Sequence, residues 1–413
     1  MNKIYPFSAI VGQDQLKQAL LLCAINPAIG GVLIIGDKGT AKSTAARALA
    51  NLLPLIKANL NCAYNCEPDN IAAECHICHD NVDFNLISSP FINLPIGATE
   101  DKIIGTIDLE RTIKEGKRVF QPGLLANANR GVLYVDEVNL LPDNLVDILL
   151  DVAAMGVNLV ARDGIIIKHQ SEFTLIGTMN PEEGNLRPQL LDRFGLMVEI
   201  QASIDPEIRT EIIRRRLKYE NCPDDFFDIW HVPELELKEQ ILRAINILPN
   251  VQLSDNLLSF ISLICCKLGI KSLRADITIS KASKTLAALD NRLKVNIDDI
   301  HIASKLVLPH RKRIGINDSH GLDNEMLNDL INEAKAQSST NKMEATKTQV
   351  DNSPVNIENL FDNKQNITIQ ANDNGQSVNI PLILLVLPLK AKLFLLFNLN
   401  LKSVFTIDGI LTL

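Results

Sequence analysis

The sequence lacks several features that would suit it to a membrane or to nucleic acid. Only 4% of its 413 residues are aromatic, tryptophan occurs once, and 49 acidic residues outnumber 41 basic ones, which leaves a net charge of −8. A dedicated nucleic-acid-binding protein usually carries a basic face, so we expect no nucleic-acid partner. The first seven residues contain neither an apolar run nor a cleavage-site pattern, so we expect a cytoplasmic protein without a secretory signal.

Long hydrophobic runs are also missing. The most apolar stretch, residues 381–413, is interrupted by two prolines and two lysines, and none of its runs approaches the roughly 20 apolar residues of a membrane-spanning helix. We therefore expect no stable membrane insertion and interpret this stretch as a short apolar tail, either strands of a truncated third domain or an aberrant end. Residues 314–380 before it are mostly polar, which is typical of a partly disordered linker.

Residues 1–203 alternate short apolar runs with helical patterns. Three such runs lie at 32–35, 132–135 and 173–176, and a stretch rich in alanine and leucine follows the first at 44–53. Short apolar strands separated by helices are typical of a parallel sheet that helices cover on both faces. The pattern therefore predicts an α/β domain in this half of the chain.

Residues 204–313 are helical in pattern and carry few strand signals. The chain enters this part through Asp205 and Pro206, and a proline in the first turn favours a helix start. The pattern predicts a small all-helical domain, with helices at 205–219, 234–246, 255–268, 274–290 and 297–308.

A glycine-containing loop follows the first apolar strand and opens a helix. Its backbone N–H groups and the helix N-terminus can cradle the phosphates of a nucleotide, with Lys42 neutralising their charge and Ser43 ligating Mg²⁺. Ala41 stands where the usual pattern has its last glycine, and we expect its φ to be negative because a methyl group is strained at positive φ. The predicted ATP-binding residues of the loop are Gly36, Asp37, Lys38, Gly39, Thr40, Ala41, Lys42, Ser43 and Thr44.

A second apolar strand ends in two acidic residues, Asp136 and Glu137. Adjacent side chains of an extended strand point to opposite faces, so the two carboxylates can have different roles. We expect Asp136 to hold Mg²⁺ and Glu137 to orient and polarise the attacking water. Together with the glycine-containing loop, this pair predicts a site that binds and hydrolyses ATP.

Polar groups after the third strand are candidates for sensing or neutralising the γ-phosphate. Thr178 and Asn180 follow the apolar run at 173–176, and Asn180 could touch the attacking water. Arg187 and Arg193 lie nearby in sequence, where an arginine at the edge of the domain can reach the nucleotide of a neighbouring subunit. Arg274 opens a helix of the second domain and could reach back to the phosphates.

Four cysteines form a Cys-x₃-Cys and a Cys-x₂-Cys pair within residues 60–80, at Cys62, Cys66, Cys75 and Cys78. Both spacings fall in the range of zinc sites, and His76 and His79 are spare ligands. A structural Zn²⁺, an iron–sulfur centre and a reduced, redox-responsive loop all remain open from these residues alone. We interpret the segment as an insertion in the α/β domain.

At several stretches the sequence closely resembles the AAA+ ATPase (I-type) subunits of magnesium chelatase and the related cobaltochelatase-like ATPases. The resemblance is dense and covers about residues 4–313. The stretches that carry it are Tyr5–Gln13, Gly36–Thr44, Phe120–Ala126, Asn129–Leu141, Gly177–Gly184 and Arg187–Gly195.

The resemblance implies a AAA+ P-loop domain at 1–203 followed by a helical lid at 204–313, with ATP and Mg²⁺ as cofactors. Val11 and Gly12 would flank the adenine, and the segment from Ile103 to Phe120 would face the ring pore or a partner subunit. The implied catalytic set is Glu137, Asn180 as sensor 1, Arg193 as the finger reaching the next subunit, and Arg274 as sensor 2.

Members of the family form a hexameric ring stacked on a second AAA+-like subunit with an adhesion domain. That pair drives a large porphyrin-binding subunit. The resemblance therefore implies a motor for the insertion of Mg²⁺ into protoporphyrin IX in chlorophyll biosynthesis. Some relatives fuse the ATPase to an adhesion domain with an Asp-x-Ser-x-Ser metal motif, which residues 381–413 do not contain.

Three other interpretations remain. A cobaltochelatase-type ATPase for cobalamin biosynthesis would use the same residues, because another subunit handles the metal and the porphyrin. A MoxR-like AAA+ remodelling chaperone shares the ATP site, but the stretches at Phe120–Ala126 and Asn129–Leu141 favour the chelatase branch. An inactive scaffold is disfavoured because the residues needed for hydrolysis are all present, namely Lys42, Asp136, Glu137 and Arg193.

Overall fold

The computed structural model describes residues 4–80, 83–116, 119–162, 165–311 and 327–332, together with the two short strands at 366–369 and 378–381. The chain divides into two units, residues 1–341 and 342–413. Among the described residues, no helix is both long and apolar enough to cross a membrane.

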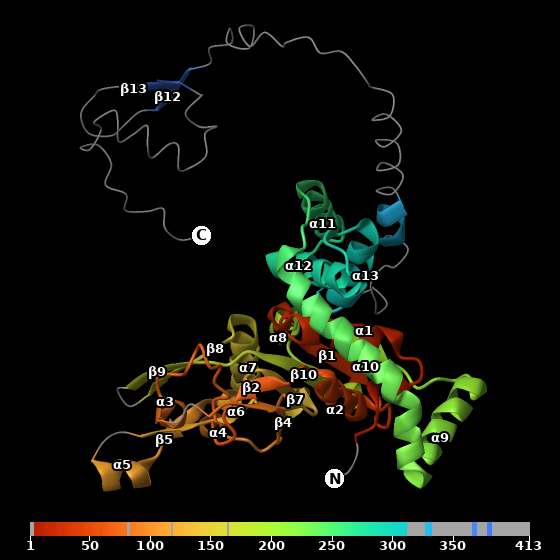
Figure 1. The fold of residues 1–413 in the computed structure, drawn as a ribbon. Coiled ribbons are helices and arrows are strands. Elements are labelled where there is room, and N and C mark those ends of the chain that lie inside the picture. The colour runs from red at the N-terminus through yellow and green to blue at the C-terminus, as the bar shows by residue number, and fades with distance from the viewer. Residues whose placement is uncertain are drawn as a thin grey trace. The chain divides into compact units, whose positions relative to one another are not determined.

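A five-stranded parallel sheet forms the centre of the first unit (Figure 1). Glycine is required at Gly36, the last residue of the strand that leads into the phosphate loop, because a Cβ there would lie 2.4 Å from the carbonyl oxygen of Ile200 on the neighbouring strand. The strands stand in the order β11 (Leu196–Ile200), β1 (Val32–Gly36), β10 (Phe173–Met179), β7 (Gly131–Val135) and β4 (Phe91–Leu94). The third predicted strand therefore lies between the other two.

Side chains of each strand alternate between two hydrophobic clusters, one on each face of the sheet. Val32 and Ile34 of β1 pack on one face, and Leu33 packs on the other. The first face is covered by α1 (Asp14–Ile25) and α2 (Lys42–Leu52), and the second by α4 (Glu100–Ile104), α6 (Leu124–Asn127), α7 (Asp143–Met155) and α8 (Pro188–Arg193). This arrangement confirms the predicted α/β class.

Three two-stranded antiparallel pairs and two short helices are added to the α/β part, and several of these elements lie at its left end in Figure 1. They interrupt the chain between the second helix and the last strand of the sheet. They comprise β2 (Ile56–Ala58) with β3 (Asn85–Ile87), β5 (Gly105–Ile107) with β6 (Phe120–Pro122), β8 (Val157–Arg162) with β9 (Ile165–Gln170), α3 (His76–Asp80) and α5 (Leu109–Glu115).

The second half of the first unit is helical, as predicted. Its helices are α9 (Pro206–Asn221), α10 (Pro223–Ile247), α11 (Asp255–Lys267), α12 (Leu273–Leu289) and α13 (Ile297–Val307). Short 3₁₀ turns lie at η1 (Phe7–Ala9), η2 (Pro27–Ile29), η3 (Val138–Leu140), η4 (Pro181–Glu183) and η5 (Leu248–Asn250). Figure 1 shows α10 running from beside α1 and α2 to α12, so that one helix joins both halves.

Two described segments lie inside the stretch expected to be a linker. Residues 327–332 are helical, and Leu327 and Ile331 are buried in the same core as the lid helices. In the second unit, β12 (Asn366–Ile369) pairs with β13 (Val378–Pro381) in an antiparallel hairpin that the polar composition did not indicate. The rest of the expected linker beyond Arg311, and the apolar tail beyond Pro381, lie outside the described residues.

Candidate functional site

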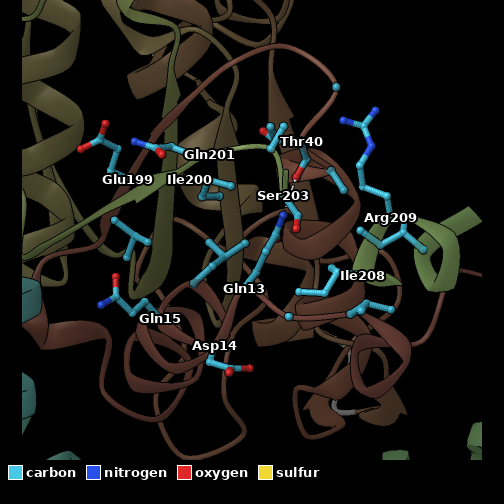
Figure 2. A pocket seen from close by; sticks show the side chains of 18 of the residues that line it. Gln13, Asp14, Gln15, Thr40, Glu199, Ile200, Gln201, Ser203, Ile208 and Arg209 are labelled. Atoms are coloured by element: carbon cyan, nitrogen blue, oxygen red, sulfur yellow. Dashed lines mark hydrogen bonds between the residues drawn. The ribbon is translucent and has the colours of Figure 1, made fainter. Parts of the chain in front are cut away.

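The phosphate loop joins β1 to α2 and is held by polar contacts within the site. Thr40 Oγ1 donates to the carbonyl of Asp37 (2.9 Å). Gln13 Nε2 donates to the carbonyl of Thr40 (3.0 Å), as Figure 2 shows. The ammonium of Lys42 folds back and donates to the carbonyl of Gly36. Burial lowers the pKa of Lys42, which means that its charge lacks part of the solvation it would have in water.

The backbone at Ala41 overturns one expectation. Its φ is +61°, not negative, and it forms the N-cap of α2 in the left-handed region. A left-handed conformation costs an ordinary L-residue roughly 1–2 kcal/mol. Among the described residues, Gln13 (φ 53°) and Glu137 (φ 51°) share this conformation at the same site. Strained backbone of this kind is concentrated at functional sites.

A pocket of about 520 Å³ opens beside the loop (Figure 2). It is lined by Val11 and Gly12, by Gly39–Ala41 of the loop, by residues 198–203 at the end of β11, and by α9. Its size is suitable for a small organic molecule, and its walls are largely apolar. Val11 and Gly12, which were predicted to flank the adenine, therefore line a pocket beside the phosphate loop.

Thr178 connects the ends of the two neighbouring strands β10 and β7. Its hydroxyl donates to Asp136 Oδ1 (2.7 Å) and accepts a hydrogen bond from the backbone N–H of Glu137 (3.0 Å). Tyr134 donates a further hydrogen bond to Asp136 Oδ1 (3.0 Å). One oxygen of Asp136 is thereby fixed, and its carboxylate stands exposed at the carboxyl edge of the sheet.

Lys38, Glu137 and Glu183 form a cluster of charged side chains beside the phosphate loop. Lys38 pairs with Glu183, and its Nζ lies 3.9 Å from Glu137 Oε1. Burial, and then the hydrogen bond and negative charge of Glu183, raise the pKa of Glu137. The hydrogen bond from Lys38 lowers the pKa of Glu183. The pKa of Glu137 is therefore raised while that of Glu183 is lowered. Neighbouring carboxyl groups whose pKa values diverge in this way are typical of sites with a general acid or base.

Asn180 lies just beyond the end of β10 and is buried. Its side-chain oxygen accepts a hydrogen bond from the N–H of Glu182 (3.3 Å) and caps η4, the turn that presents Glu183. Asn180, the predicted sensor, thus lies in the same short segment as Glu183, which contacts Lys38 and Glu137.

Arg187 and Arg193, two of the predicted arginines, form ion pairs with helix α7. Arg193 Nη1 lies 2.7 Å from Asp151 and 3.1 Å from Asp147, both on α7, and Arg187 pairs with Asp143 at the start of the same helix (2.6 Å). The predicted finger is therefore engaged by acidic groups of its own subunit.

Arg274 lies in the first turn of α12, and its side chain approaches Asp192 of the α/β domain. Its Nη1 is 3.9 Å from Asp192 Oδ2, which also accepts a hydrogen bond from Ser272 Oγ (3.0 Å). Arg311, whose side chain is buried, lies 3.5 Å from Asp192 Oδ1 and donates to the carbonyls of Asp192, Phe194 and Gly195. These contacts tie the lid to the segment that carries Arg193.

Sequence reasoning gave no separate role to Glu183, Asp192 or Arg311. The first two lie in stretches that carried the family resemblance, and the acidic pair that follows Asn180 and Pro181 was a signal for Glu183. Arg311 had no such signal, because its partners at 192–195 are distant in sequence.

The four cysteines are also brought together. All are buried, and their sulfur atoms lie within 4.8 Å of one another. His76 and His79, considered as spare ligands, are exposed.

Comparison with known proteins identifies the family of this chain. The family model for magnesium chelatase, subunit ChlI, matches residues 6–188, and that for the AAA lid domain matches residues 259–333. The magnesium-chelatase subunit ChlI homolog of Methanocaldococcus jannaschii is 50% identical over 82% of this chain and 93% of its own length. The magnesium-chelatase subunit ChlI of Synechocystis sp. is 47% identical over 75% of this chain and 88% of its own.

A solved structure supports the fold independently. The crystal structure of a protein from Cytophaga hutchinsonii is 19% identical and has a TM-score of 0.53, covering 79% of this chain and 90% of that one. The central sheet, the helical lid and the extent of the similarity to ChlI proteins lead to one conclusion. This chain belongs to the magnesium-chelatase ChlI family and is an AAA+ ATPase subunit of the magnesium-chelatase type.

Proposed function

We propose that this chain binds ATP in the pocket between Val11–Gly12 and the phosphate loop, and that its hydrolysis drives insertion of Mg²⁺ into protoporphyrin IX by a porphyrin-binding partner. One observation carries the proposal. The phosphate loop, the adjacent pair Asp136 and Glu137, and Asn180 come from three separate stretches and meet at the carboxyl edge of β1, β10 and β7. In parallel α/β sheets this edge is where ligands bind.

The residues present fit MgATP. Gly39 has a φ of +84° and open space where a Cβ would stand, so the loop backbone can approach a phosphate closely. Lys42 can exchange the Gly36 carbonyl for a phosphate oxygen, which would restore the solvation lost by its ammonium. Ser43 and the free oxygen of Asp136 would hold the Mg²⁺, whose charge neutralises that of the phosphates.

Glu137 would accept the proton of the attacking water. Its raised pKa makes it a better base than an exposed glutamate, and Glu183 sustains that shift. Asn180, at the end of the strand between the loop and the acidic pair, would orient the same water. Lys38 would balance the charge of the two glutamates until nucleotide binds.

We further propose a homo-oligomeric ring, with six subunits as expected from the family resemblance. In it Arg193 would leave Asp147 and Asp151 and reach the nucleotide of the next subunit, while Arg274 would approach the phosphates of its own subunit. The proposed partners are a second AAA+-like chelatase subunit with an adhesion domain and the large porphyrin-binding subunit, all in the cytoplasm. A structural Zn²⁺ is proposed at the cysteine cluster and argued below.

ATPase measurements on two variants test the catalytic assignment. We expect Lys42→Ala to abolish nucleotide binding. Glu137→Gln should still bind nucleotide but lower kcat by about 100-fold or more, the usual contribution of a general base. Lys294→Ala, at an exposed position in the lid, is the matched control and should behave as the wild type. Unchanged rates in both site variants would contradict the assignment.

Reconstitution tests the pathway. With the porphyrin-binding and second ATPase-like subunits of magnesium chelatase, wild-type protein and ATP should produce magnesium protoporphyrin, followed by its absorbance. Glu137→Gln should fail in the same mixture. A parallel assay with Co²⁺ and the large cobaltochelatase subunit identifies the cobalt alternative, and ATPase activity without metal insertion in either mixture would favour a remodelling chaperone.

A further inference from the structure

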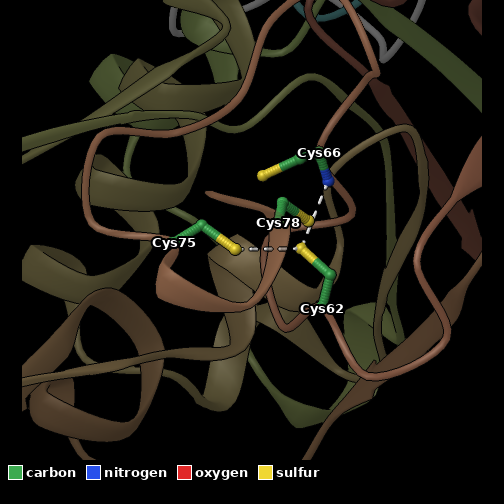
Figure 3. A group of neighbouring side chains, drawn as sticks. All are labelled: Cys62, Cys66, Cys75 and Cys78. Atoms are coloured by element: carbon green, nitrogen blue, oxygen red, sulfur yellow. Dashed lines mark hydrogen bonds between the residues drawn. The ribbon is translucent and has the colours of Figure 1, made fainter. Parts of the chain in front are cut away.

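A cluster of four cysteines lies in the segment between β2 and β3, apart from the ATP site. Cys62, Cys66, Cys75 and Cys78 are each no more than 6% exposed, and their sulfur atoms lie within 4.8 Å of one another (Figure 3). The sulfurs of Cys62 and Cys75 are 3.5 Å apart. The segment has little regular structure besides the single turn of α3, so the side chains themselves must account for its compact form.

We propose that these four thiolates bind one Zn²⁺ in a tetrahedral structural site. A Zn–S bond of about 2.3 Å places the sulfurs of such a site about 3.8 Å apart, close to the spacing seen between Cys62 and Cys75. A disulfide would require about 2.05 Å. An iron–sulfur cluster contains several iron and sulfide atoms, which do not fit among four sulfurs this close together. The exposed His76 and His79 leave thiolates as the ligand set.

Backbone N–H groups support the sulfurs as they do at metal centres. The N–H of Cys66 donates to Cys62 Sγ (3.5 Å), and that of Ala72 donates to Cys66 Sγ (3.4 Å). Hydrogen bonds of this kind fix the orientation of ligands and offset the negative charge of thiolates. Arg130 adds a positive charge nearby, since its Nη1 lies 3.5 Å from the Cys66 carbonyl.

The cluster is fastened to the strand that carries the acidic pair. Asn65 donates to the carbonyl of Asn127 at the end of α6 (2.8 Å), and Asn129 donates to the carbonyl of Tyr64 (2.8 Å). Arg130, directly before β7, donates to the carbonyl of Lys57 (2.9 Å). Asn65 and Arg130 both adopt positive φ, as residues do where surrounding contacts determine the backbone. The metal would thus brace the insertion against the amino end of β7.

Metal analysis of the full-length chain tests the proposal. Protein expressed in zinc-supplemented medium, freed of any affinity tag, should contain one Zn²⁺ per chain and no stoichiometric iron by mass spectrometry. A mercurial that modifies thiols should release this zinc in step with the loss of four thiolates. Cys62→Ser and Cys78→Ser should each lose the metal, whereas Cys222→Ser and Cys266→Ser, at exposed positions, should retain it.

Three results would overturn the proposal. One is folded wild-type protein without stoichiometric metal and with all eight thiols free. Another is a mass two or four units below that of the reduced chain, which would indicate disulfides. The third is a coloured preparation with iron in place of zinc. Since the wild-type protein alone decides these outcomes, a variant that fails to fold does not affect the test. Metal content is also independent of ATP hydrolysis, so the failure of one proposal is distinguishable from that of the other.

Discussion

Glu183 raises the pKa of Glu137 through a hydrogen bond and through its negative charge. In Glu183→Gln the charge is removed, and Lys38 is left to pair with Glu137 alone, so the pKa of Glu137 should fall. As the proposed general base, Glu137 would act in its deprotonated form, and the acid limb of the kcat/KM profile should therefore move to lower pH. The measurement is the pH dependence of steady-state ATPase activity, which reports groups of the free enzyme.

A control separates this effect from general damage to the site. Glu182→Gln changes the neighbouring carboxylate, which is not among the main causes of the pKa shift at Glu137, and should leave the acid limb in place. An acid limb that stays fixed in Glu183→Gln would show that Glu183 does not set the proton affinity of the base.

At the scale of single residues, sequence patterns place side chains well and backbone conformations poorly. The motifs placed Lys42 after β1 and Asp136 after β7, and the structure brings both to the same edge of the sheet, with β10 between the two strands. The φ of Ala41 could not be obtained from them, because it depends on how the surrounding loop and α2 hold the chain. The ion pair between Lys38 and Glu183 joins two loops far apart in sequence, and the sequence patterns did not predict it either.

Among the elements, α10 acts as a clamp on the N-terminal segment. Glu234 accepts hydrogen bonds from the backbone N–H groups of Phe7 (3.1 Å) and Ser8 (3.0 Å) and from the Ser8 hydroxyl (2.6 Å). This contact fixes the chain just before Val11 and Gly12, which line the pocket.

Replacing Glu234 with alanine should therefore weaken nucleotide binding more than turnover. We expect a several-fold higher KM for ATP, little change in kcat, and a loss of about 1–3 kcal/mol in unfolding free energy, typical of hydrogen bonds to a charged group. Steady-state kinetics and urea unfolding provide the two measurements. Glu236→Ala, at an exposed position two residues along, should leave both unchanged; a similar KM in the two variants would refute the clamp.

The same helix shows where element prediction failed. The sequence pattern predicted that this helix begins at Glu234. That prediction is wrong, because α10 begins at Pro223 and continues through Pro233. A proline inside a helix removes one hydrogen bond and usually marks a boundary. Here Phe226 before the proline and Ile241 after it are both buried, and this packing maintains one continuous helix. Of the five strands of the sheet, β1, β7 and the first part of β10 were predicted from their apolar runs, whereas β4 and β11, each interrupted by a polar residue, were not.

At the scale of the whole first unit, Arg311 is a buried polar link between the lid and residues 192–195 of the α/β domain. Burial lowers its pKa to about 10, so the guanidinium remains charged at neutral pH. Arg311→Met would leave Asp192 and the carbonyls of Phe194 and Gly195 without this donor. Breaking a buried ionic contact from one side costs about 3–5 kcal/mol, and we expect a loss of that order in urea unfolding.

Lysine at the same position should rescue little, because its single ammonium cannot replace several fixed N–H donors. Arg216→Ala, which removes an exposed pair with Glu220, is the control and should change stability by no more than about 0.5 kcal/mol. Equal stability of Arg311→Met and wild type would show that the Arg311 contacts add no net stability to the joint between the lid and the α/β domain.

Composition separated the α/β part from the helical part, but it did not reveal how they are joined. The contacts of Arg311 with residues 192–195 depend on the folded chain returning to a place more than a hundred residues earlier. The burial of Leu327 and Ile331 could not be read from a polar stretch either.

The pairing of Arg193 with Asp147 and Asp151 has a consequence for assembly. If this arginine serves the neighbouring subunit, ring closure exchanges one set of charged partners for another and does not simply add a contact. Added salt would weaken both the internal pairs and the contact across the ring, so the balance between single subunits and rings should depend less on ionic strength than for an arginine that starts free in solvent. The bound nucleotide, with its concentrated negative charge, would then decide when the subunits close.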